Sequence, residues 1–178
     1  LWLADAYECK GDSCNQTEML LDAYDRQLNA AGCSIPDNCL RTWFYVQNID
    51  VNYMGMVKAR KDFFEQIGLT SKTHFIASTG IEGKSDMSSS FVRLDSYYVK
   101  GLQDGQIQYL RALSHLNPTY EYGVTFERAT AVHYGDRKHI FLSGTASINN
   151  KGEILYEGDI EKQTYRMWEN CDALLHEA

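Results

Sequence analysis

The sequence predicts an α+β fold, in which a mixed sheet carries its helices on one face. Two observations support this class. Patterns typical of strands and helices follow one another as helix, strand, helix and two strands, and then, after a connector, as three strands and a helix. Each group of strands is accompanied by at most two helices, an arrangement in which the helices cover one face of a sheet. The second observation is that the chain contains one turn-and-helix sequence twice.

The repeated sequence covers residues 11–31 and 158–178, which align without a gap at an offset of 147 positions. Both copies read Gly-Asp-x-x-x-Gln-Thr, followed by apolar residues at helical spacing. We interpret the chain as part of a tandem duplication cut out of phase with its repeat. Residues 1–100 are then the C-terminal part of a first unit, 101–123 a connector, and 124–178 the N-terminal part of a second. The tail of one copy and the head of the next are expected to close a single sheet.

The helices are predicted from apolar residues at helical spacing. The first is expected over residues 15–31, with Asp12 or Ser13 as its N-cap, and the second over about residues 50–67. The third is the second copy of the repeat. Aromatic and β-branched residues predict the strands, with 139–147 as the hairpin partner of 124–134 and 89–100 returning antiparallel. The predicted strands cover residues 40–46, 73–81, 89–100, 124–134, 139–147 and, briefly, 153–156.

Composition limits the possible classes of function. The 178 residues suit one domain or two small ones, and the formal charge of −7 opposes non-specific nucleic-acid binding. No apolar run approaches the roughly 18 residues of a membrane span. The five cysteines form no Cys-x-x-Cys pair, so we expect reduced thiols in a cytoplasmic protein. A disulfide, or a zinc site from Cys9, Cys14, Cys33 and Cys39, are the alternatives left open.

Small polar residues end two of the predicted strands. Ser78-Thr79-Gly80 ends one strand, and Ser143-Gly144-Thr145 ends another. Either glycine marks a strand end where backbones approach closely, or the two segments form a pocket rim that offers hydroxyl and N–H groups to a ligand. Glu82 follows the first segment, where it is a candidate general acid or base, or else an exposed loop carboxylate.

Charged and imidazole side chains within strands give further candidates. Arg128 follows Glu127 in an apolar strand, so the two side chains should face opposite ways. Arg128 is therefore either one half of a surface ion pair or an inward cation for an anionic ligand. His74 and His139 also lie on strands, where a hydrogen-bonded structural role and a catalytic role are the two readings. No residue spacing typical of a metal site or a cofactor is present, and none is predicted.

Several of these residues resemble the Rid family, also called YjgF-like. The likeness lies in Ile140-Phe141-Leu142-Ser143-Gly144, in the Gly-Asp-x-x-x-Gln-Thr helix starts, and in the strand at residues 41–46. Two such units resemble the tandem, chorismatase-type branch. The resemblance implies a chorismate-mutase-like α+β fold and a homo-oligomer, a trimer or pseudo-trimer, with ligand pockets between subunits. It also implies metal-free hydrolysis of imines or enamines of amino acids; older labels for the family include translation inhibitor.

The chain departs from this family at one position. In the family an arginine on the fifth strand grips the substrate carboxylate, whereas residues 71–80 of this chain contain no arginine. Lys72 is a poorer substitute because it lacks the planar fork of a guanidinium. Two hypotheses follow: a hydrolase or deaminase-type enzyme for a small carboxylate, whose pocket Arg128 or Arg137 completes, and a non-catalytic binding or assembly module.

Overall fold

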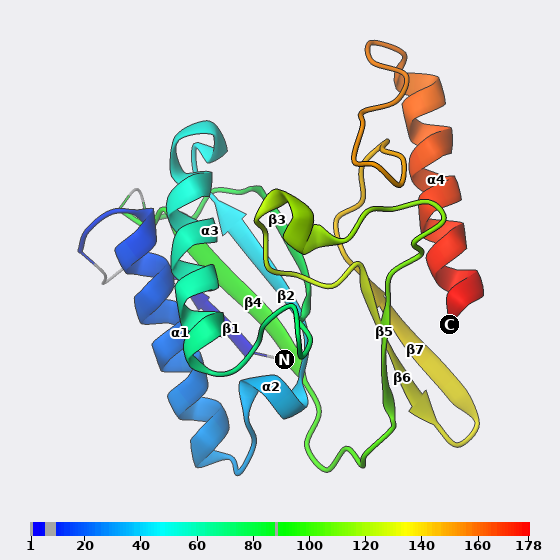
Figure 1. The fold of residues 1–178 in the computed structure, drawn as a ribbon. Helices are drawn as coiled ribbons and strands as arrows, with labels where there is room; N and C mark the ends of the chain where they lie inside the picture. Colours follow the sequence, from blue (N-terminus) through cyan, green and yellow to red (C-terminus); the bar gives the residue numbers. More distant parts are fainter. Residues whose placement is uncertain (1, 6–9, 88) are drawn as a thin grey trace.

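The computed structural model describes residues 2–5, 10–87 and 89–178, and it contains two sheets with helices beside each (Figure 1). The first sheet has four strands in the order β1-β4-β2-β3, and the second has three in the order β5-β6-β7. The strands are β1 (Trp2–Asp5), β2 (Cys39–Val46), β3 (Ala77–Glu82), β4 (Val92–Tyr98), β5 (Ile107–Leu110), β6 (Ala129–Tyr134) and β7 (Arg137–Leu142).

The four-stranded sheet is mixed, as the sequence predicts. Strands β2 and β3 are parallel, while β4 runs antiparallel to both β1 and β2. Helices α1 (Ser13–Ala30) and α3 (Ile49–Gln66) lie next to each other on one face of this sheet (Figure 1). Alternate residues of β2, Phe44 and Val46, are buried in the core shared with the helices. Helices packed on one face of a mixed sheet are therefore confirmed.

The three-stranded sheet is an antiparallel meander. Strand β6 pairs with both β5 and β7, and α4 (Ile160–Glu177) lies against this sheet through Leu174 and Ala173 (Figure 1). The predicted hairpin across residues 135–138 is present. The connector at 101–123 contains more structure than predicted, since it supplies β5 and the 3₁₀ helix η1 (Thr119–Tyr122). Residues Ile35–Asn38 form one helical turn, α2.

The expected closure into a single sheet is wrong. The hairpin β6–β7 belongs to a sheet separate from β2, and the strand pairing between the two sheets is an isolated parallel bridge from Ala77 of β3 to Glu127. The physical reason is that the chain pairs with β3 at one residue only, Glu127. After Arg128 it continues as β6, which pairs with β5 and β7 instead. Two smaller predictions also need correction. Strand β4 pairs with β1 and β2 rather than with β3, and residues 153–156 form only an isolated bridge to Ile148.

The repeated sequence adopts the same local structure in both copies. Helices α1 and α4 each contain 18 residues. Asp12 caps α1 by accepting a hydrogen bond from the Asn15 N–H at 3.0 Å, and Asp159 caps α4 by accepting one from the Lys162 N–H at 3.1 Å. The following threonines also correspond, since each donates to the carbonyl four residues earlier, at 2.7 Å for Thr17 and 2.8 Å for Thr164.

The larger core contains a tyrosine and a thiol that titrate only at alkaline pH. Burial raises the pKa of Cys39 from about 9 to about 11, and burial also raises the pKa of Tyr24 above its ordinary value near 10. Both groups are neutral in the fold, whereas the unfolded chain loses their protons at lower pH. Their stabilising effect is thus complete below pH 9 and is lost as the pH rises from there.

We therefore expect the free energy of unfolding to fall by about 2–3 kcal/mol between pH 9 and 11 through Cys39 alone. Urea titrations at both pH values measure it. The variant Cys39→Ala should have a smaller pH dependence than the parent, while Cys33→Ala, which also removes a buried thiol, serves as the matched control. Equal pH dependence in the two variants contradicts the assignment to Cys39.

Candidate functional site

The two strand-end segments singled out in the sequence meet where the sheets join. The backbone N–H of Ser78 donates to Ser143 Oγ at 2.8 Å, and the N–H of Gly144 donates to the Ser78 carbonyl at 3.4 Å. Ser143 Oγ in turn donates to the Glu127 carbonyl. We call Ser78, Glu127, Ser143 and Gly144 the sheet junction. Residues 65 positions apart in sequence are thus brought together, as a shared pocket rim requires.

A buried network of hydroxyl groups and an arginine is hydrogen-bonded to Ser78 of the sheet junction. Thr42 Oγ1 donates to Ser78 Oγ at 2.8 Å, and the fully buried guanidinium of Arg60 donates to Ser78 Oγ and to Thr125 Oγ1, each at 3.3 Å. Sequence reasoning missed Arg60. A signal was present, since Arg60 occupies the apolar stripe of α3 with Met56 and Phe63, a position where a charged side chain is rare.

A second arginine, Arg41 of β2, was also missed. It is buried on the face of the sheet opposite the helices, donates to Thr79 Oγ1 and to the Thr42 carbonyl, and stacks on Trp43 with 4.7 Å between guanidinium carbon and ring centroid. Burial lowers the pKa of Arg41 to about 10, which leaves it charged at neutral pH. Thr79 is therefore held by Arg41 at the edge of the candidate site.

Arg128 is buried, so it is an inward cation rather than half of a surface ion pair. Its Nη2 donates to the carbonyl and to Oδ1 of Asn117 at 2.8 and 2.9 Å, and its Nε donates to the same carbonyl at 3.2 Å. Its guanidinium also lies over the Phe126 ring, at 5.6 Å. Glu127 is also buried and accepts a hydrogen bond from the Phe75 N–H at 2.9 Å. A small pocket is lined by both Glu127 and Arg128, so the opposite orientation of the two side chains stays a prediction.

A groove of about 630 Å³ opens beside these residues, within the usual size range for small-ligand sites. Its walls combine aromatic rings with two cations and one carboxylate. The lining residues are Tyr53, Asn117, Glu121, Val124, Phe126, Arg128, Gly144, Ala146, Ile148, Lys151 and Gly152.

The remaining strand-end residues support the groove from outside its lining. A Cβ at Gly144 would lie 3.2 Å from Thr79 Cγ2, and one at Gly80 would lie 2.9 Å from Tyr53 Cε2. Gly80 therefore lets the Tyr53 ring lie directly on β3. Thr145 Oγ1 donates to the Ser143 carbonyl at 3.0 Å, which holds the turn that carries Gly144.

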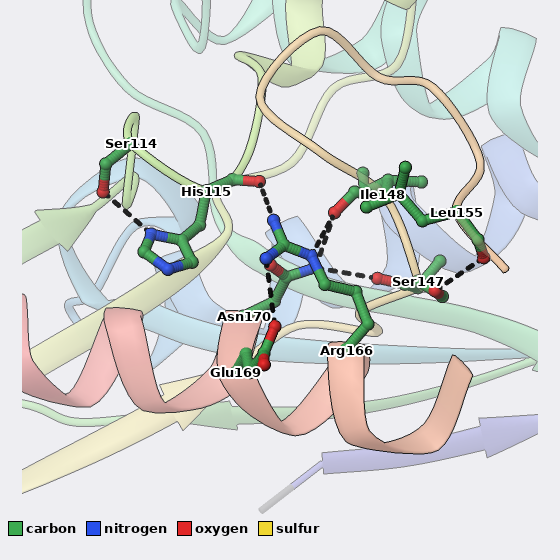
Figure 2. A network of polar contacts seen from close by, with 9 residues as sticks. Ser114, His115, Ser147, Ile148, Leu155, Arg166, Glu169 and Asn170 are labelled. Carbon is green, nitrogen blue, oxygen red and sulfur yellow. Dashed lines mark hydrogen bonds and ion pairs between the residues drawn. The ribbon is translucent and has the colours of Figure 1, made fainter. Parts of the chain in front are cut away.

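Polar side chains of α4 contact the loop that contributes Ala146 and Ile148 to the groove lining, and Figure 2 shows the contacts made by Arg166. Arg166 Nε donates to the Ile148 carbonyl at 3.1 Å, and its Nη2 reaches the His115 carbonyl at 3.4 Å. Asn170 Nδ2 donates to the carbonyls of Ala146 and Ile148, both at 3.0 Å. The polar residues of α4 thus hold residues 146–148 in place.

Other sequence candidates lie away from the groove lining. Glu82 is exposed and accepts hydrogen bonds from the N–H groups of Asn48 at 3.1 Å and Ile49 at 2.7 Å. These contacts cap the N-terminus of α3, where a carboxylate is favourable. Lys72 is exposed. Arg137 is exposed at the hairpin tip, where it pairs with Asp136 at 2.6 Å. His74 lies just before β3 rather than on a strand, and its ring stacks on Tyr109 of β5 with ring centroids 4.3 Å apart.

Among residues 10–87 and 89–178, Cys14, Cys33, Cys39 and Cys171 are free thiols, while Cys9 lies outside the described residues. Within that part of the chain, no group of three or more His, Cys, Asp or Glu side chains could hold a metal ion. The described helices also include none with the length and apolar character needed to cross a membrane.

The fold is similar to that of part of a chorismatase. A crystal structure of that enzyme matches 97% of this chain with a TM-score of 0.75 at 18% sequence identity, and the chain spans about half, 52%, of the enzyme's length. A YjgF-family protein from Neisseria meningitidis matches 53% of the chain and 74% of its own length, with a TM-score of 0.44 and 18% identity. No family model and no curated protein matches the sequence.

Proposed function

We propose that the groove beside the sheet junction binds a small carboxylate. The observation that carries this proposal is the position of Arg128, a buried and charged guanidinium in the wall of an otherwise largely apolar groove. Asn117 and Phe126 fix its orientation, and Lys151 adds a second positive charge to the lining. A cation held in one geometry and partly shielded from water is suited to an anionic ligand.

We further propose that the bound acid is hydrolysed without a metal, as an imine, an enamine or a chorismate-like acid. The fold shared with a chorismatase supports this class of reaction. In this scheme Arg128 and Lys151 bind the carboxylate of the ligand, and the Gly144 turn and Thr79 shape the groove wall. Glu121 is the acidic side chain of the lining. Glu82, the acid or base expected from the sequence, caps α3 instead and is left out of the scheme.

A non-catalytic binding module is the second candidate function. The observation that favours it is that Ser78 and Ser143 hydrogen-bond to each other's segments, and Arg128 bonds to Asn117. Hydrogen bonds of this kind give these side chains a structural role that requires no chemistry. Release of ammonia from freshly generated 2-aminoacrylate, above the rate of the Arg128→Met variant, distinguishes the enzyme from the module.

Binding is tested by calorimetry with pyruvate, 2-oxobutyrate and chorismate as probes. We expect Arg128→Met to weaken binding at least 30-fold and Lys151→Glu to weaken it about tenfold, equivalent to about 1.4 kcal/mol. Lys84→Glu is the matched control, because it makes the same charge change at an exposed lysine outside the groove lining.

Lys151 is exposed, so its variant tests the groove even if Arg128→Met fails to fold. Equal binding by Lys151→Glu and Lys84→Glu contradicts the proposed site, as does the absence of binding of all three acids to the parent chain.

We also propose a homo-oligomer, a trimer or pseudo-trimer, formed through the face of the four-stranded sheet opposite α1 and α3. That face carries Trp43, Tyr45 and Arg93, all half-buried, and Arg93 lies over the Tyr45 ring at 5.8 Å. Aromatic and arginine side chains are enriched in subunit interfaces. Sedimentation equilibrium tests this proposal, since a mass that stays at the 20.3 kDa of one chain contradicts it.

A further inference from the structure

The outer face of α4 is apolar and exposed. A shallow groove runs along it, lined by residues that include Tyr165, Trp168, Cys171 and Leu175. The exposed fractions are 57% for Tyr165, 58% for Trp168, 48% for Leu175 and 78% for Ile160, which lies in the first turn of the same helix. Large apolar side chains gathered on one side of a helix indicate a surface that is covered by another part of a protein.

The internal repeat shows what covers this face in the other copy. At the offset of 147 positions, Trp168 corresponds to Leu21, Cys171 to Tyr24 and Leu175 to Leu28. All three residues of α1 are buried, in the core that α1 shares with α3 and the four-stranded sheet. Apolar character is thus kept at equivalent positions, although among the described residues this face is covered in α1 and exposed in α4.

The opposite faces of the two helices show the reverse pattern. Asn170 and Leu174 are fully buried on the side of α4 that faces the three-stranded sheet. Their counterparts in α1, Ala23 and Gln27, are half-buried and exposed. Each of the two helices therefore has one buried face, and the face buried in α1 is the one that is exposed in α4. A complete repeat accordingly places its helix between a three-stranded meander on one side and a four-stranded sheet with a second helix on the other.

We infer that the outer face of α4 docks a segment of the same polypeptide, following Ala178, that folds as β2, α3, β3 and β4 do. A second copy of this chain does not fit the role, because its own α1 already covers α3 and that face of its sheet. The inference concerns the tandem organisation expected from the repeat and stands apart from the proposed carboxylate groove.

The experiment compares this 178-residue chain with the protein made from its complete reading frame. Trp168→Glu should leave the urea midpoint of the 178-residue chain within error of the parent. In the longer protein the same change should lower the midpoint by at least 1 M. Leu21→Glu, the matched change in α1, should destabilise both proteins.

A second readout is the rate at which a maleimide labels Cys171 under native conditions. We expect the rate in the longer protein to be at least tenfold lower than in the 178-residue chain, with Cys14 of α1 as the reference thiol. Three outcomes overturn the inference: a reading frame that stops at or near Ala178, equal labelling of Cys171 in both proteins, or a dimer of the 178-residue chain that Trp168→Glu dissociates.

Discussion

Phe44→Ala is expected to lower the free energy of unfolding by about 3–5 kcal/mol, the range for removing a fully buried aromatic ring. Phe44 is completely buried at the centre of β2, in the core formed with α1 and α3. Its ring also lies beneath the Arg60 guanidinium, 5.7 Å from the ring centroid, so the substitution removes a cation–π contact as well as apolar packing. Urea denaturation followed by far-ultraviolet circular dichroism measures the loss.

The control for this substitution is Trp43→Ala in the same strand. Trp43 points to the opposite face of the sheet and is only half-buried, so about 1–2 kcal/mol is expected even though more side-chain volume is removed. If Trp43→Ala destabilises the protein as much as Phe44→Ala does, the assignment of the main core to the Phe44 face of the sheet is contradicted.

Glu127→Ala is expected to cost about 2–4 kcal/mol of unfolding free energy. The buried carboxylate of Glu127 accepts the Phe75 N–H, and the same residue forms the bridge to Ala77 at which the two sheets meet. Alanine leaves the Phe75 N–H buried without its acceptor, and an unpaired buried donor alone costs about 1–3 kcal/mol. The change of midpoint in urea, combined with exchange of the Phe75 amide proton, measures both effects.

Glu127→Gln is the matched variant, because its side-chain oxygen can still accept the same hydrogen bond without the charge. We expect it to retain all but about 1 kcal/mol of the stability and to keep the Phe75 amide protected. Rapid exchange at Phe75 in both variants argues that the backbone bonds of the sheet junction, rather than this carboxylate, hold the two sheets together.

The helices could be predicted closely because their signals are local. Asp12, one of the two candidate N-caps, caps α1, and Asp159 caps α4 at the matching position of the second copy. The predicted start at Asn15 was two residues late, since Ser13 already belongs to α1. A helix end depends on hydrogen bonds between residues three or four apart, so a short stretch of sequence contains most of the information.

The sheets were predicted less well because strand pairing is not local. The spacing of apolar residues shows that residues 92–98 form a strand, but not that this strand lies between β1 and β2. In the same way, Ala77 and Glu127 each read as an ordinary strand residue, and only the fold shows that the sheets separate beside them. The order of strands is decided by packing among distant segments, which the helical and strand periodicities do not describe.

The candidate site was predicted in part for the same reason. Ser78 and Ser143 stood out because small polar residues end apolar strands, and they do meet. Arg60 and Asn117 did not stand out, since their importance comes from partners that lie 18 and 11 positions away in sequence. Burial turns an ordinary arginine into a positioned cation, and burial is a property of the assembled fold.

The narrow contact between the sheets also determines how the molecule can open. The bridge, a few backbone and hydroxyl hydrogen bonds, and the His74–Tyr109 and Tyr97–Phe141 ring contacts connect a larger core with a smaller one that contains Leu110, Leu116 and Leu174. Partial unfolding follows weakly connected boundaries, so we expect the meander and α4 to unfold as one cooperative unit and the four-stranded sheet with its helices as another. The groove is lined by residues of both units, such as Tyr53 of α3 and Ile148 in the loop before α4, so it forms only while the two units are in contact.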